Sequence, residues 1–319
     1  MNSVPTKFDK PTPTRDGYGA GLHKVGEQDA RVVALDADLA ESTRSKWFGD
    51  AHPGRFFQMG IAEQDMVLTA AGLASAGLRP FASTFAIFTE RAFEITRNAV
   101  ARPNLNVKIV GSHGGIMTGE DGSSAHAIED VAIYRALPNF RVVVPADANE
   151  AMNAVAALNA TDGPAYLKLT RQKVPIVTAP EAAFDVGRWP TLREGADVTL
   201  LANGALVAEA LGAYDLLKAQ GVLARVANAH TVKPVDVATL ERAARETGAL
   251  VTAEDHSVIG GLGGAVAEAV TQTYAVPVER VGVQDRYLES GLPTELYEKY
   301  GLTAKALAAA ALDAMKRKR

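Results

Sequence analysis

The sequence contains no cysteine among its 319 residues, and it has no apolar run long enough to cross a membrane. The lack of cysteine excludes disulfide bonds, thiol nucleophiles and thiolate metal sites. A membrane-spanning helix needs about 18 or more consecutive apolar residues, and the first ten residues lack the apolar core of a secretory signal. Any chemistry must therefore use oxygen and nitrogen groups, and we expect a cytoplasmic protein with no membrane partner.

An excess of charge of one sign is also missing. Lys and Arg total 33 against 37 Asp and Glu, which gives a formal net charge of −4. This balance supplies no broad attraction to nucleic acid, so no nucleic-acid partner is expected. Charged residues make up 22% and hydrophobic residues 47% of the chain, which is typical of folded globular proteins. The length predicts two packed units.

Short apolar or β-branched runs alternate with longer helical stretches in the first half of the chain. Six of these runs are predicted as strands, namely Arg31–Asp36, Phe56–Met59, Arg79–Ser83, Val107–Gly111, Arg141–Val144 and Ala165–Leu169. Between them, Gln64–Ala76 and Ala148–Leu158 carry small or apolar residues at helical spacing. This alternation predicts an α/β domain whose doubly wound sheet is mostly parallel.

The pattern changes after Leu169, where prolines and glycines between residues 175 and 195 interrupt any periodicity. We interpret this stretch as an inter-domain connection and place the boundary near residue 185, which divides the chain into domains 1–185 and 186–319. A second alternating series follows, with predicted strands at Val198–Ala202, Val222–Ala227, Ala249–Thr252 and Val278–Val281 and helices near Ala205–Gln220, Asp236–Thr247 and Thr303–Met315. It predicts a smaller doubly wound α/β domain.

Two segments have an ordinary structural interpretation when they are taken alone. Glu63 stands at the start of a predicted helix, where an acidic residue favourably meets the helix dipole. Phe81, Phe85 and Phe88 have the spacing of a buried helical face, for which core packing is the default interpretation.

Two glycine-rich segments remain. The loop Gly111–His126 combines five glycines, two histidines and a Glu-Asp pair after a predicted strand, where open α/β sheets bind ligands. Its histidines lack metal-ligand spacing, so no metal ligand is assigned in this chain. The segment Glu254–Gly264 fails the dinucleotide-binding pattern because Val266 occupies the last glycine position. We expect it to serve close helix–strand packing or a subunit contact, with His230 and His256 as structural histidines.

Taken together and in order, these segments resemble the C-terminal half of the transketolase family of thiamine-diphosphate enzymes. The matching stretches are Asp36–Ser42, Phe57–Gln64, Ser83–Phe88, Gly119–Gly122 with Glu129-Asp130, Pro138–Phe140 with Val144–Asp147, Leu169–Gln172, His230–Pro234 and Glu254–Gly264. The resemblance covers nearly the whole chain. It implies that residues 1–185 form the domain that binds the aminopyrimidine of the cofactor and that the rest forms the family's C-terminal domain.

The family's domain for the diphosphate and Mg²⁺ has no counterpart in these 319 residues. The resemblance therefore implies a two-chain transketolase, in which an N-terminal-type partner subunit holds Mg²⁺ and the diphosphate. Thiamine diphosphate would then lie between the subunits, and two copies of each chain are expected. The implied reaction transfers a two-carbon ketol unit between ketose and aldose phosphates, a step of carbohydrate metabolism.

The resemblance also assigns roles to individual residues. Glu63 would bond to a pyrimidine nitrogen and is the main catalytic candidate. The other cofactor-binding candidates, which flank Glu63 or would pack on the pyrimidine, are Ile61, Phe85, Phe88 and Arg91. The candidates for binding the sugar phosphate are Arg15, Ser42, His113 and Arg171, of which His113 is also a catalytic candidate. Asp121 would contact a substrate hydroxyl as a further catalytic candidate.

One departure from the family pattern affects the substrate pocket. Where the family usually has histidine, this chain has Ala125, and the next residue is His126. His126 is therefore carried as a substitute catalytic candidate. Arg91 stands near the place of a stacking tyrosine.

Two alternatives to a transketolase subunit stay open at this point. One is a subunit of a decarboxylating thiamine-diphosphate enzyme, similar to deoxyxylulose-phosphate synthase or to the β subunit of a 2-oxo-acid dehydrogenase. The other is a non-catalytic assembly subunit that keeps the fold, which Ala125 favours and Glu63 disfavours.

Overall fold

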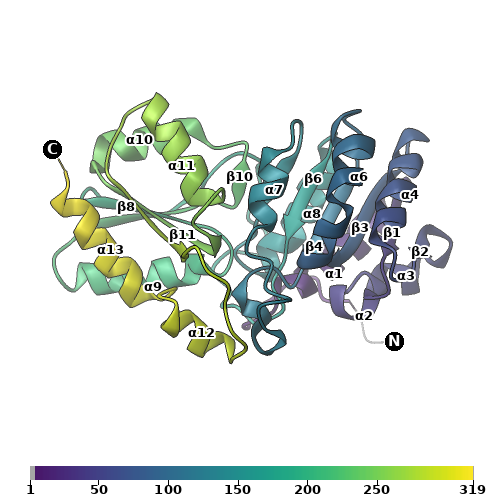
Figure 1. Ribbon diagram of the computed structural model, residues 1–319, viewed down its shortest axis with the longest axis horizontal. Helices are drawn as coiled ribbons and strands as arrows, with labels where there is room; N and C mark the ends of the chain where they lie inside the picture. The colour runs from purple at the N-terminus through teal and green to yellow at the C-terminus, as the bar shows by residue number, and fades with distance from the viewer. Residues whose placement is uncertain (1–3, 319) are drawn as a thin grey trace.

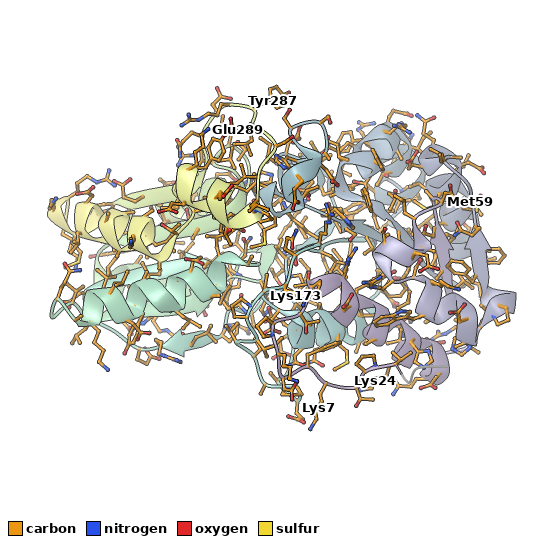
Figure 2. All side chains as sticks on the ribbon, turned by 90° about the horizontal axis from the view of Figure 1, so that it is seen from below. Lys7, Lys24, Met59, Lys173, Tyr287 and Glu289 are labelled. Carbon is orange, nitrogen blue, oxygen red and sulfur yellow. The ribbon has the colours of Figure 1, made fainter. Side chains whose placement is uncertain are left out.

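The computed structural model describes residues 4–318 as two α/β units that lie side by side (Figure 1). Each unit is built on its own sheet. The segment that connects the units passes between them, and Figure 2 shows Lys173 of this segment at their boundary. The expected fold class, with two doubly wound domains, is confirmed.

The first sheet is parallel except at one edge. Its strands, in spatial order, are β10 (Thr231–Lys233), β5 (Arg141–Val143), β6 (Ala165–Lys168), β4 (Lys108–Ser112), β3 (Arg79–Phe85), β1 (Val32–Asp36) and β2 (Phe56–Gln58). The antiparallel edge strand β10 comes from the second half of the chain, a pairing that the sequence pattern did not predict.

Helices cover both faces of this sheet. The helical segments of the first unit are α1 (Thr14–Gln28), α2 (Ala40–Thr43), α3 (Lys46–Ala51), η1 (Pro53–Arg55), α4 (Glu63–Ser75), α5 (Ala86–Thr89), η2 (Glu90–Ala92), α6 (Phe93–Ile95), η3 (Thr96–Ala101), η4 (Ile116–Asp121), α7 (Asp130–Ala136) and α8 (Ala148–Ala160). In β1, Val32 and Ala34 pack with α1 and α8, whereas Val33 and Leu35 pack with α4 and α7. Successive side chains of this buried strand therefore point to opposite faces of the sheet and pack into two different apolar layers.

The second unit repeats this plan with fewer strands. Its sheet has the order β12 (Val278–Val283), β11 (Leu250–Ser257), β8 (Val198–Ala202), β9 (Ala224–Asn228) and β7 (Thr191–Arg193), and only β7 is antiparallel. Its helices are α9 (Leu206–Lys218), α10 (Val237–Thr247), α11 (Leu262–Gln272), α12 (Pro293–Lys299) and α13 (Ala304–Lys316). Leu200 faces a layer with α9 and α13, and Leu201 faces a layer with α10 and α11.

Two local expectations need correction. Phe81, Phe85 and Phe88 do not share a helical face, because Phe81 lies within β3, Phe85 ends that strand and Phe88 lies in α5. Strand β11 does not end near Thr252 but continues to Ser257. The buried carboxyl groups in this extension have partners: Glu254, for example, accepts hydrogen bonds from the backbone N–H groups of Leu262 and Gly263, which offsets the cost of burying it.

Candidate functional site

The carboxyl group of Glu63 is buried at the first residue of α4, with 2% of the residue exposed. Gly60, in a left-handed conformation with φ of 69°, turns the chain just before this helix. A buried carboxylate needs a partner, and the Arg91 guanidinium supplies one at 3.0 Å between Nη1 and Oε2. Arg91 itself is more than half exposed and stays largely hydrated, whereas the buried Glu63 carboxylate depends on having a partner.

Three aromatic rings form a row that starts beside this ion pair. The Arg91 guanidinium lies over the Phe88 ring, Phe88 stacks on Phe85 with centroids 5.7 Å apart, and Phe85 stacks on the His113 imidazole at 3.8 Å. The last contact follows from sheet register, because Phe85 at the end of β3 is paired with Ser112 at the end of β4. The row therefore spans the carboxyl ends of two neighbouring parallel strands.

His113 is the far end of the row, and it is held as a neutral imidazole. Its Nδ1 lies 2.9 Å from Ser112 Oγ, and its Nε2 lies 3.4 Å from Arg15 Nη1. Because guanidinium can only donate, Nε2 accepts from Arg15 and the proton is assigned to Nδ1. Burial, followed by the charges of Arg15, Arg171 and Arg44, lowers the pKa of His113 to about 3.

Three guanidinium groups gather around His113. Burial and the charges of Arg44 and Arg171 lower the pKa of Arg15, against an opposing effect of Asp16. Arg15 Nη1 donates to the backbone carbonyl of Ser42 at 2.9 Å, while its buried Nε has no hydrogen-bond partner within residues 4–318. Positive charge and a free donor at one place suit a phosphate-type anion.

The other two guanidinium groups, those of Arg44 and Arg171, form ion pairs with carboxylates of the same chain. Arg44 Nε is 2.7 Å from Asp16 Oδ1, and Arg171 Nη1 is 3.0 Å from Asp121 Oδ1. The sequence analysis missed Arg44 and Asp16. Their positions in the sequence could have identified them, because Arg44 closely follows the family-like stretch Asp36–Ser42 and Asp16 directly follows the candidate Arg15.

The remaining predicted residues lie around this core. Ser42 is half buried and contributes its carbonyl oxygen to Arg15. Ile61 is 76% exposed beside the start of α4. His126 is buried, and its Nε2 donates to the Gly119 carbonyl oxygen at 3.0 Å, inside its own loop. The structure therefore brings Arg15, His113 and Arg171 together, but it engages His126 in a separate contact.

His230 and His256, the two histidines interpreted as structural, are both buried. His230 Nδ1 lies 2.9 Å from Thr231 Oγ1, and His256 Nε2 accepts from the Ala132 backbone N–H at 3.2 Å. Across residues 4–318, no group of three His, Cys, Asp or Glu side chains is placed to hold a metal ion. In the same range, none of the helices is both long and apolar enough to cross a membrane.

The row of rings thus joins two chemically different ends. One end offers a buried carboxyl group beside aromatic faces, which suits a flat, basic heterocycle. The other offers clustered guanidinium groups and a neutral imidazole, which suit a small anion.

Two family descriptions match the chain in succession. "Transketolase, pyrimidine binding domain" matches residues 10–177, and "Transketolase, C-terminal domain" matches residues 187–307. Together they cover both units of the fold.

Relatives of similar length exist. The chain is 41% identical over 307 residues to a putative transketolase C-terminal section of Methanocaldococcus jannaschii, with 95% of this chain and 96% of the relative covered. It is 44% identical over 305 residues to a 6-deoxy-6-sulfo-D-fructose transketolase subunit of a Clostridium species, with 95% of each covered. A solved structure described as a split gene transketolase, inactive beta4 tetramer, matches with a TM-score of 0.91 and 48% identity, over 96% of this chain and 99% of that one.

The low pKa of His113 leads to a test by NMR. Because the folded-state pKa is about 3 and that of an unfolded histidine is about 6.5, the imidazole signal of His113 should not titrate between pH 8 and pH 5. Between about pH 6.5 and pH 3, the unfolded chain binds a proton at His113 that the folded chain does not. The free energy of unfolding therefore falls as the pH drops through this range.

The variant His113→Gln identifies the signal by its loss and serves as the control. It should lose less thermal stability than the native chain between pH 7 and pH 5. A His113 titration midpoint above about 5.5 would contradict this assignment.

Proposed function

The chain belongs to the transketolase family, and on this basis we propose that it is the C-terminal-type subunit of a two-chain transketolase that depends on thiamine diphosphate. The complex would transfer a two-carbon ketol unit from a ketose phosphate to an aldose phosphate. The observation that carries the proposal is the row Phe88, Phe85 and His113, which links a buried carboxyl group to a cluster of guanidinium groups.

The residues beside Glu63 fit the aminopyrimidine of the cofactor. A carboxyl group with 2% exposure can share a proton with a ring nitrogen, because exclusion of water strengthens such a bond. Phe85 and Phe88 are only partly buried and can pack on a flat ring. When bound, the cofactor supplies a nucleophilic carbon that carries the ketol unit. Glu63 would hold the proton that sets the state of the pyrimidine.

A partner subunit would complete the site. Exposed apolar side chains occur on the same stretch of chain as Glu63: Ile61 is 76% exposed, Leu68 53% and Phe57 38%. Apolar exposure beside a polar site is typical of a protein interface. An N-terminal-type partner would hold Mg²⁺ and the diphosphate, and the similar length of the relative named as a C-terminal section supports this division.

The anionic group of the sugar would bind at Arg15, His113 and Arg171. One relative is named for a sulfonated ketose, and a sulfonate carries one negative charge at neutral pH. The convergence of three guanidinium groups on this chain favours the greater charge of a phosphate. Asp121, which now pairs with Arg171, would be released to bind a substrate hydroxyl.

Reconstitution tests the proposed function directly. With the N-terminal-type partner, Mg²⁺ and thiamine diphosphate, the complex should convert xylulose 5-phosphate and an aldose phosphate, and each chain alone should be inactive. Release of CO₂ from pyruvate would instead indicate the decarboxylating alternative. A stable complex that binds the cofactor but transfers no ketol unit would indicate an assembly role.

Replacement of Glu63 tests its role in proton transfer. In the reconstituted complex, Glu63→Ala should lower kcat at least about a hundredfold, the usual scale for loss of a proton-transfer group. The control is Asp65→Ala, which removes an exposed carboxylate from the same helical turn and should change kcat less than about twofold. Near-normal turnover of the Glu63 variant would remove Glu63 from this role.

Replacement of Arg171 tests the anion cluster. Arg171→Ala should raise the KM of phosphorylated substrates about tenfold or more, because a hydrogen bond to a charged group contributes about 1.5–3 kcal/mol. The KM of a non-phosphorylated ketose should change little. The control, Arg188→Ala, removes an exposed guanidinium outside the cluster. Equal kinetics for native and variant complexes would exclude Arg171 from phosphate binding.

A further inference from the structure

A carboxylate of the second unit binds the glycine-rich loop of the first. Asp255 lies near the C-terminal end of strand β11 and is 7% exposed. It accepts hydrogen bonds from the backbone N–H of Ile116 at 2.8 Å and of Met117 at 3.3 Å, and from the Tyr297 hydroxyl at 3.1 Å. One buried side chain therefore joins the start of η4 to β11 and α12.

The glycines of this loop allow the second unit to approach. Gly115, Gly119 and Gly122 all have positive φ values, of 77°, 72° and 81°. A Cβ at Gly115 would overlap the Asp255 carboxyl group, and one at Gly119 would lie 2.9 Å from Pro293 Cγ. A Cβ at Gly122 would overlap Ser290 Oγ. The glycine pattern thus matches close contact with the second unit.

The figures show where the two units meet. In Figure 1, α12 lies against the segment that follows β4, where the two units meet. Figure 2 shows Tyr287 and Glu289, from the segment before α12, at the edge of the second unit that borders the first.

The clamped segment reaches two residues of the anion cluster. Thr118 Oγ1 donates to the His113 carbonyl oxygen at 2.6 Å, and the Thr118 carbonyl oxygen accepts from Arg171 Nη1 at 3.2 Å. His113 has a φ of 61°, a conformation that non-glycine residues keep only when their surroundings hold it. A shift at Ile116 and Met117 would therefore move Thr118 and, through it, His113 and Arg171.

We propose that Asp255, supported by Tyr297, is a positioning residue that holds the loop 114–121 so that His113, Asp121 and Arg171 can bind the sugar phosphate. This inference rests on the proposed function, and it gives the second unit a specific part in that function. Asp255 does not touch the substrate. It acts through the backbone of the loop.

The test uses two variants in the reconstituted complex. Asp255→Asn keeps one carbonyl oxygen but places an amide NH₂ where a second acceptor is needed, so it should raise the KM of xylulose 5-phosphate about tenfold or more. Tyr297→Phe removes one hydroxyl donor and should change KM in the same direction by a smaller factor. It keeps the inference testable if Asp255→Asn fails to fold. The dissociation constant of thiamine diphosphate should change less than about twofold in both.

A matched control separates positioning from simple domain docking. Arg135 also joins the units, because its Nη1 donates to the Gly260 carbonyl oxygen at 3.1 Å, but it does not contact the loop through any hydrogen bond in the described chain. Arg135→Ala should lower thermal stability without changing the KM of the sugar phosphate. Hydrogen exchange should become faster in peptides covering 114–122 for Asp255→Asn and not for Arg135→Ala.

The outcomes distinguish this inference from the proposed function. A native complex without ketol transfer would overturn the proposed function, and the inference would then be judged by hydrogen exchange and by calorimetric binding of xylulose 5-phosphate to the cofactor-free complex. An active native complex with unchanged KM in both variants would overturn the inference alone. Unchanged exchange in the loop would also overturn it.

Discussion

The stacking of His113 on Phe85 is the contact on which the geometry of the site depends. The two rings are 3.8 Å apart because β3 and β4 are neighbours and end in register. Phe85 also touches Phe88, which lies beside the Glu63–Arg91 pair. A change in the register of either strand would therefore separate the buried carboxyl group from the guanidinium cluster. A parallel sheet buried on both faces resists such a change.

Both ends of the site contain a charge that is paired within the chain by an accessible partner. Glu63 is paired with Arg91, which is 55% exposed, and Arg171 is paired with Asp121, which is 41% exposed. The partly exposed Arg171–Asp121 pair contributes about 0–1 kcal/mol, whereas the buried Glu63 carboxylate would be costly to leave without a partner. Ligand binding would therefore exchange one partner for another and would not uncover a lone buried charge, whose cost is much higher. Arg15 differs, because its buried Nε has no hydrogen-bond partner in the described residues and lies only at the distance of a weak ion pair, 4.0 Å, from Asp16 Oδ1.

The sequence predicted the elements of this fold better than their contacts. The helix that begins with Glu63 could be predicted from its helical apolar spacing and its acidic first turn. The strand Val198–Ala202 could be predicted from its short apolar and β-branched run. The edge strand β10 could not be predicted, since it pairs across the two units. The same holds for the Phe85–His113 stack, which depends on strand register. The family resemblance supplied Arg15, His113 and Arg171, but Arg44 emerged only when the fold brought the guanidinium groups together.

The glycine-rich loop shows why the second unit matters to a site that lies in the first. A loop with left-handed residues at His113, Gly115, Gly119 and Gly122 gains little from local propensity, and strained backbone persists only where surrounding contacts determine it. Backbone carbonyl groups accept from Gly114, Gly115 and Thr118, but the N–H groups of Ile116 and Met117 donate to the carboxylate of Asp255, which lies outside the loop. Glycine keeps its conformational freedom in the unfolded chain, which makes ordering of such a loop costly.

A buried carboxylate on a rigid strand is suited to offset that cost, because its own position is fixed by the sheet and by Tyr297. The geometry of the guanidinium cluster therefore depends on the junction between the two units, and the first unit without its neighbour would lack the contacts of Asp255 with the loop.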